Sequence, residues 1–82
     1  MIINEILSQD KNFRYQLLDR MQEDCNYYLE VSRSNNNLWA GNTTEQIEIM
    51  KAIWNSFSND EKPEWITWED ILEFERKFLT SH

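Results

Sequence analysis

The feature that most constrains this fold is the spacing of apolar residues just past the middle of the chain. They recur at steps of three and four positions, as Ile47, Met50, Trp54 and Phe57. This period is typical of an amphipathic helix, which buries one apolar stripe against the rest of the protein. We therefore expect a helix over about residues 44–57, and we expect the other segments to pack against it.

The turn before this helix contains the only glycine of the chain, Gly41. Glycine adopts a positive φ at little cost, and we expect Gly41 to do so where the chain turns into the helix. Thr43 or Thr44 is expected to cap the first helical turn. Gln46 lies three positions after Thr43, which is the spacing of a capping box, so its side chain is expected near the start of the helix.

Two other segments have a helical period, and both are expected to form helices. One covers about residues 13–31 and the other about residues 68–79. Thr67 is the expected cap of the second, with Asp70 three positions on. The residues expected to be buried by these two helices are Phe13, Leu17, Met21, Cys25, Tyr28, Leu29, Trp68, Ile71, Leu72, Phe78 and Leu79, with Phe74 flanking them.

The connections between these helices are short and polar. Residues 32–37 read Ser-Arg-Ser-Asn-Asn-Asn, a composition that favours a flexible loop. Pro63 disfavours a helical conformation at the residue before it, and Trp65 and Ile66 are expected to return the chain to the core. An apolar stretch at residues 2–7 predicts a short opening helical turn.

These patterns predict an all-α fold, a small bundle of three main helices with a short N-terminal helical turn. The chain has 82 residues, the length of one domain, and we treat 1–82 as a single acidic helical domain. One glycine and one proline are too few for a sheet protein with many tight turns. The four tryptophans are expected mainly in the core, because an aromatic side chain buries about 150–250 Å².

The chain is acidic, with a formal net charge of −7 at pH 7. This charge disfavours binding to nucleic acid or to an anionic membrane, and it favours a partner with a basic surface. Residues 60–75 contain seven acids and one lysine, a local net charge of −6. The alternative is that these acids form a solvated face that only keeps the protein soluble. The acids expected to contact a partner are Asp60, Glu61, Glu64, Glu69, Asp70 and Glu73.

Aromatic side chains offer a second candidate surface. Tyr27 and Tyr28 are adjacent, so a helix points them in different directions, and we expect the hydroxyl of Tyr27 in solvent. Tyr and Trp are enriched among the residues that dominate binding energy. An exposed surface around Tyr27 and Trp39 would allow a homodimer to form.

The sequence contains no constellation for catalysis or metal binding, so we expect neither an enzyme nor a bound cofactor. Cys25 lies on the apolar face of its predicted helix and is expected in the core. The only histidine is the last residue, His82. The two have neither the spacing of a metal site nor that of a nucleophile with its base.

A cytoplasmic location is expected from three features. The single cysteine cannot form an internal disulfide. The N-terminus lacks the basic start and long apolar run of a signal peptide. No apolar run approaches the length that crosses a bilayer.

Two short stretches of the chain are distinctive: Asp-Cys-x-Tyr at residues 24–27 and Leu-Trp-Ala-Gly-Asn at residues 38–42. With several other stretches, they resemble the eleventh of the large polyvalent protein-associated domains, from about residue 15 to residue 75. Family members often carry glycines in the loop where this chain has residues 32–37, so the loop differs. The other matching stretches are residues 15–21, 27–29, 45–47 and 63–67, with Met50.

The resemblance implies a context rather than a reaction. Such domains occur as modules of very large proteins delivered by phages and conjugative elements, and as small proteins of mobile elements, and the family has no established catalytic residues. We therefore expect a non-enzymatic protein-binding accessory. In its most concrete form it inhibits a host defence nuclease, as anti-CRISPR or anti-restriction proteins do, by presenting the acids to a basic, nucleic-acid-binding surface. The alternative is a homo-oligomeric structural or interaction module of a mobile element.

Overall fold

The computed structural model describes residues 2–31 and 34–80. This part of the chain forms α1 (Ile2–Leu7), α2 (Lys11–Glu30), a 3-10 turn η1 (Asn35–Asn37), α3 (Thr43–Ser56) and α4 (Trp68–Thr80). No residue in these two ranges belongs to a strand. The predicted all-α bundle, with three long helices and a short N-terminal one, is confirmed. Of the loop predicted at 32–37, Ser32 and Arg33 lie outside the described residues.

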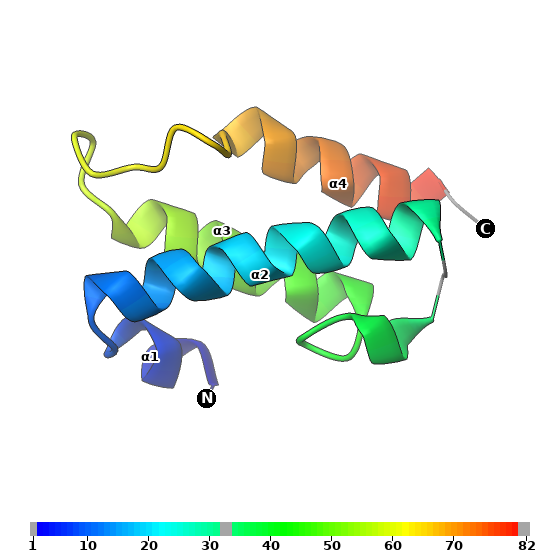
Figure 1. Ribbon diagram of the computed structural model, residues 1–82, viewed down its shortest axis with the longest axis horizontal. Helices are drawn as coiled ribbons and strands as arrows, with labels where there is room; N and C mark the ends of the chain where they lie inside the picture. The colour runs from blue at the N-terminus through cyan, green and yellow to red at the C-terminus, as the bar shows by residue number, and fades with distance from the viewer. Residues whose placement is uncertain (1, 32–33, 81–82) are drawn as a thin grey trace.

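Helix α3 is the centre of the bundle, because it contacts α1, α2 and α4. The longest helix, α2, runs alongside both α3 and α4, while α1 lies near the N-terminal end of α2 (Figure 1). The helix expected to organise the chain therefore does so. The buried apolar residues are Ile6, Leu17, Leu18, Met21, Cys25, Leu38, Ile47, Ile49, Met50, Ile53, Phe57, Ile66, Ile71, Phe74 and Phe78.

Helix α2 begins at Lys11, two residues before the predicted start. Asp10 is its N-cap, and the Asp10 carboxylate accepts a hydrogen bond of 2.8 Å from the backbone N–H of Phe13. An acid at this position satisfies one unpaired N–H and interacts favourably with the helix dipole. The apolar period begins only at Phe13, so it did not indicate the first turn.

Helix α3 is capped by Asn42, so the prediction of Thr43 or Thr44 as the cap was wrong. The Asn42 side chain accepts a hydrogen bond of 2.8 Å from the backbone N–H of Glu45. Gly41, directly before it, has a φ of 85°, which confirms the expected positive φ. The N-cap therefore lies one residue before Thr43, the first of the two threonines predicted as caps.

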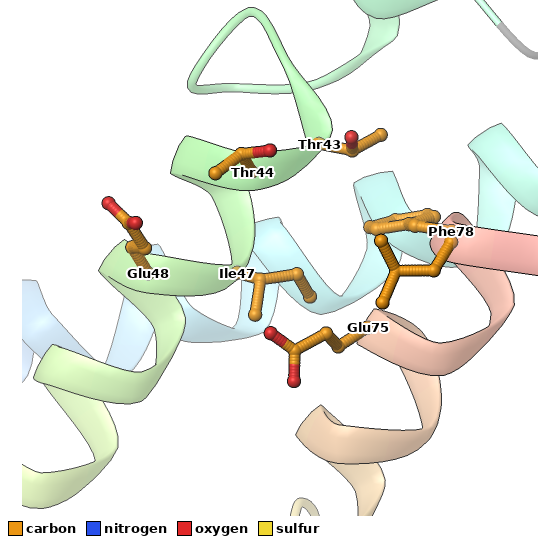
Figure 2. A pocket seen from close by; sticks show the side chains of 7 residues that line it. Thr43, Thr44, Ile47, Glu48, Glu75 and Phe78 are labelled. Atoms are coloured by element: carbon orange, nitrogen blue, oxygen red, sulfur yellow. The ribbon is translucent and has the colours of Figure 1, made fainter.

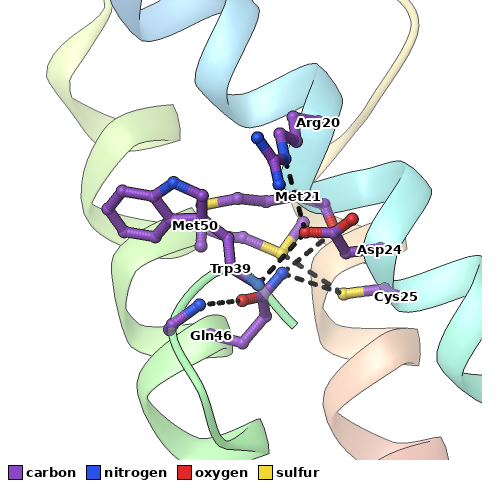
Figure 3. Close-up of polar contacts among 8 residues, drawn as sticks. Arg20, Met21, Asp24, Cys25, Trp39, Gln46 and Met50 are labelled. Atoms are coloured by element: carbon purple, nitrogen blue, oxygen red, sulfur yellow. Dashed lines mark hydrogen bonds and ion pairs between the residues drawn. The ribbon is translucent and has the colours of Figure 1, made fainter. Parts of the chain in front are cut away.

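Gln46 is fully buried and does not form the predicted capping box. Its side-chain oxygen accepts a hydrogen bond of 3.0 Å from the backbone N–H of Ala40, and its nitrogen donates one of 3.2 Å to the carbonyl of Met21. Beside it, the backbone N–H of Trp39 donates to the Asp24 carboxylate at 3.1 Å (Figure 3). These contacts fasten the turn before α3 to the middle of α2.

Helix α4 starts with the predicted cap. The Thr67 hydroxyl accepts a hydrogen bond of 3.1 Å from the backbone N–H of Asp70, and the Asp70 carboxylate accepts one of 2.9 Å from the backbone N–H of Thr67. This reciprocal pair satisfies donors that the first helical turn leaves open. The buried stripe of the helix consists of Ile71, Phe74 and Phe78.

None of the four tryptophans is fully buried, and the core is mostly aliphatic. Trp39, Trp54 and Trp68 are half-buried, and the rings of Trp54 and Trp68 lie 5.5 Å apart at a tilt of 46°. Trp65 is 44% exposed, so the prediction that it returns to the core was wrong, although that for Ile66 is confirmed.

Three further burial predictions were wrong. Leu72 and Leu79 are exposed on α4, and Phe13 is exposed on α2. On α4, the helix packs through the stripe that contains Phe74, so Leu72 and Leu79 lie beside that stripe rather than in it. Phe74, which was expected only to flank the core, is buried.

Candidate functional site

The segment of residues 57–67, between α3 and α4, is held in place through its backbone. The Tyr15 hydroxyl donates a hydrogen bond to the carbonyl of Glu61, and the Tyr15 ring stacks on Phe57 with centroids 4.4 Å apart. The ammonium of Lys62 donates to the carbonyl of Phe57 and lies 4.7 Å from the ring centre of Trp54. Lys62 is the only cation of the acidic stretch, and it therefore faces the protein rather than the acids.

All six acids predicted to contact a partner are exposed. Asp60, Glu61 and Glu64 lie on the 57–67 segment, whereas Glu69, Asp70 and Glu73 lie in the first half of α4. Glu69 and Glu73 are one helical turn apart and lie away from the buried stripe. The prediction that these residues are accessible to a partner agrees with this placement, and partner binding itself stays a prediction.

Cations from elsewhere in the fold neutralise part of this charge. Lys11 of α2 pairs with Glu61 at 3.0 Å, and Lys51 of α3 pairs with Glu75 at 3.0 Å. Within α4, Arg76 pairs with Glu73. The local charge of −6 counted along the sequence therefore overstates the charge that this surface presents.

Two of these ion pairs shift the pKa of the acid. The pKa of Glu61 is lowered, first by the hydrogen bond from Lys11 and then by one from Ser58. The pKa of Glu73 is lowered mainly by the hydrogen bond from Arg76. Both carboxylates are exposed, so salt screens these pairs strongly.

Four acids remain without a cation partner among the described residues, and we call them the unpaired acids: Asp60, Glu64, Glu69 and Asp70. Asp60 accepts a hydrogen bond of 2.8 Å from the Ser58 hydroxyl, and Asp70 accepts one of 2.9 Å from the backbone N–H of Thr67, the cap of α4. The side chains of Glu64 and Glu69 form no hydrogen bond with the described part of the chain. These four acids can attract a basic surface without first losing an internal ion pair.

An open hollow of about 340 Å³ lies where the 57–67 segment meets α2. Its lining residues are Tyr15, Gln16, Asp19 and Trp65, and we call it the Trp65 hollow. Sequence reasoning missed it because Trp65 was assigned to the core. The available signal was that Trp65 and Ile66 are adjacent, since consecutive side chains seldom point the same way.

A second hollow, of about 170 Å³, lies between the first turns of α3 and the last turns of α4 (Figure 2). Ile47 and Phe78 supply its apolar surface, and Leu79 at its edge is 72% exposed. Glu48 and Glu75 also line it, but Glu75 already pairs with Lys51. This hollow suits an apolar group better than a charged one.

The two aromatic residues predicted to bind a partner differ in exposure. Tyr27 is 49% exposed on α2, and no described residue bonds its hydroxyl, as expected. Trp39 is half-buried and lines a third hollow with Phe13, near α1. A homodimer through these two residues stays a prediction.

The groups considered for catalysis and metal binding have no reactive arrangement in residues 2–31 and 34–80. Cys25 is fully buried, and burial raises the pKa of its thiol to about 12, so the thiol is protonated at neutral pH. No three His, Cys, Asp or Glu residues within these ranges are grouped to hold a metal ion. His82 lies outside the described residues.

None of the described helices combines the length and apolar character needed to span a bilayer. The longest of them, α2, carries charged residues along most of its length.

Comparison with known families shows which family the chain resembles. The sequence model of the family described as large polyvalent protein-associated domain 11 matches residues 11–78, which is most of the chain. No curated protein and no solved structure matches the chain. The matched range includes α2, α3, the acidic segment and α4 as far as Phe78.

Proposed function

The chain belongs to the family of large polyvalent protein-associated domain 11, and from this premise we propose that it is a non-enzymatic protein-binding accessory of a phage or other mobile element. Its partner is a host protein with a basic surface. In its most specific form, the partner is a defence nuclease, and the domain inhibits it by occupying the surface that binds nucleic acid.

The observation that carries this proposal is the set of unpaired acids. Asp60, Glu64, Glu69 and Asp70 are exposed in one continuous stretch of chain, and none of them forms an ion pair with a described cation. A nuclease needs lysine and arginine to bind phosphates. Acids of this kind would attract such a surface over a distance and compete with nucleic acid for it.

The first test is capture of a partner from a lysate of the bacterial host by the tagged domain. The informative variant is Glu64→Gln with Glu69→Gln, because these two side chains bond to no described residue. The matched control is Glu23→Gln with Glu30→Gln, which removes the same charge from exposed positions of α2. We expect the first variant to lose the partner and the control to keep it.

The second test is the activity of the captured protein. A nuclease partner should cleave its substrate more slowly in the presence of the domain, and the inhibition should weaken as salt rises, because exposed charge contacts are screened. If the partner binds equally well in high salt and to both double variants, the acidic surface is not the contact. If a captured nuclease retains full activity, the inhibitor form of the proposal is wrong.

A homo-oligomeric module is the second candidate, and exposed apolar side chains favour it. Leu79 and Val31, near the C-terminal ends of α4 and α2, and Tyr27 are all exposed. Light scattering of the purified protein separates the two functions. A stable dimer that Leu79→Glu dissociates supports assembly, whereas a monomer at all concentrations supports the accessory.

A further inference from the structure

We infer that the Trp65 hollow binds an arginine side chain of the basic partner. This inference rests on the proposed function. It names one specific contact, an arginine in the Trp65 hollow, on an acidic surface that otherwise attracts its partner only through charge. It requires an exposed aromatic face, an unpaired carboxylate and enough space, and the hollow supplies all three.

Trp65 supplies the aromatic face. It is the most exposed tryptophan of the described chain, at 44%, and no described residue takes a hydrogen bond from its indole N–H. Gln22 donates a hydrogen bond of 3.4 Å to the Trp65 carbonyl, which fastens the backbone of this residue to α2. The backbone that carries the ring is therefore fixed, and the ring remains open to solvent. A guanidinium is planar and weakly hydrated, and it stacks on such a ring.

Asp19 supplies the charge. It lines the same hollow, is exposed, and forms no ion pair with any cation among residues 2–31 and 34–80. Its neighbour Arg20 is turned instead toward Asp24, at 3.9 Å. A guanidinium over Trp65 would therefore find a carboxylate that no arginine of the described chain occupies.

The position of the hollow connects it to the unpaired acids. Glu64 precedes Trp65 directly, and the Tyr15 hydroxyl that helps to line the hollow bonds to the carbonyl of Glu61. A basic chain attracted by Asp60 and Glu64 would thus have the hollow within reach. The hollow between α3 and α4 offers no such site, because the aromatic residue among its lining residues, Phe78, is buried and presents no open face.

The test uses three blocked tripeptides, acetyl-Gly-X-Gly-amide, in which X is arginine, lysine or citrulline. Citrulline has nearly the shape of arginine without the charge. Each peptide is titrated into the ¹⁵N-labelled full chain, and the Trp65 indole N–H and the amides of Tyr15, Gln16 and Asp19 are followed by NMR. We expect saturable shifts with arginine, weaker ones with lysine and none with citrulline. The variant Trp65→Leu assigns the indole signal.

Two variants and one control sharpen the result. Asp19→Asn should raise the dissociation constant of the arginine peptide by up to about fivefold, the range for an exposed ion pair. Trp65→Leu should raise it by roughly two- to fivefold, the range for an exposed cation–aromatic contact. Glu23→Gln, one turn further along α2, should leave it nearly unchanged. If Trp65→Leu is poorly folded, Asp19→Asn still decides the question.

Other outcomes overturn the inference. Equal shifts with arginine and lysine spread over all the acids would indicate only general attraction, and shifts centred on Leu79 would place the site elsewhere. The capture experiment separates this inference from the proposed function. If Glu64→Gln with Glu69→Gln loses the partner while Asp19→Asn keeps it, only the arginine site fails. If the peptide binds as expected but no partner is captured, only the proposed function fails.

Discussion

The two longer connections of the fold are fastened to the helices by opposite kinds of hydrogen bond. Both the turn at residues 38–42 and the segment at residues 57–67 carry a tryptophan between two helices. In the turn, the backbone N–H groups of Trp39 and Ala40 donate to Asp24 and Gln46, and the tryptophan is half-buried. In the segment, side chains from other parts of the fold donate to backbone carbonyls, and Trp65 is exposed.

This difference indicates which kind of connection can bind a partner protein. The backbone N–H groups of the turn donate to a carboxylate and an amide oxygen, so the Asp24 carboxylate is occupied by a contact within the protein. The segment is held by donors that lie outside it, the Tyr15 hydroxyl and the Trp54 indole N–H, so its own acids remain free to face solvent. A segment fixed by donors from elsewhere can be both ordered and highly charged, and this is the combination that a binding surface requires.

The largest expected effect tests the turn through Gln46. Gln46→Leu would leave the Ala40 N–H without its acceptor, at about 1–3 kcal/mol for an unsatisfied buried group, and would remove the second hydrogen bond that the Met21 carbonyl accepts beside its helical one, at about 0.5–1.5 kcal/mol. We expect the free energy of unfolding to fall by about 2–4 kcal/mol, measured by urea denaturation. Gln16→Leu, at an exposed position of α2, is the control and should change it by less than about 0.5 kcal/mol. Equal effects would mean that the buried contacts do not hold the turn.

The next largest effect tests the backbone of the same turn. A Cβ at Gly41 would meet nothing within 4 Å, so Gly41→Ala costs only the strain of a φ of 85°. That strain is about 1–2 kcal/mol. Gly41→Asn should cost less, because asparagine tolerates this region better than alanine. Thermal unfolding of both variants checks the order, and a harmless alanine would contradict the conformation of the turn.

A smaller effect tests how the segment is fastened. Tyr15→Phe removes the donor to the Glu61 carbonyl but keeps the ring that stacks on Phe57. We expect a loss of about 0.5–1.5 kcal/mol in the free energy of unfolding, as for one hydrogen bond. Tyr27→Phe is the matched control, because no described residue bonds that hydroxyl, and it should change little. The same cost for both would show that the Tyr15 contact does not hold the segment.

The smallest effect concerns pH and the Lys11–Glu61 pair. The pKa of Glu61 is lowered in the folded protein, so the pair stabilises the fold above the unfolded pKa, near 4.5, and this contribution is lost as the pH falls through the folded pKa. Lys11→Met should move the Glu61 pKa back toward 4.5, followed by NMR titration of its carboxyl carbon. Arg76→Met, which removes the partner of Glu73, should leave the Glu61 pKa lowered. If Lys11→Met has no effect, the pair does not persist in solution.

The features predicted correctly from the sequence are those with local causes. The Thr67 cap, the positive φ of Gly41 and the buried Cys25 depend on a few neighbouring residues or on the helical period. Gln46 was misplaced because its acceptor at Met21 lies 25 positions away. A local capping rule cannot anticipate such a partner.

The candidate site was predictable as a list of acids but not as a surface. Lys11 reaches Glu61 across 50 positions, and Lys51 reaches Glu75 across 24, so only the fold reveals which acids are neutralised. Trp65 was misassigned for a related reason. A tryptophan can lie in the core or on a binding surface. Here Ile66 is buried, and the adjacent Trp65 therefore points outward.

The tilted pair formed by Trp54 and Trp68 has an optical consequence. The two indoles come from α3 and α4, lie 5.5 Å apart and are inclined by 46°, so their electronic transitions should couple. Far-ultraviolet circular dichroism of this protein should then contain an aromatic couplet superimposed on the helical signal. Trp68→Phe would remove the couplet while the helices remain. The couplet would therefore report the docking of α4 onto α3 separately from the formation of either helix.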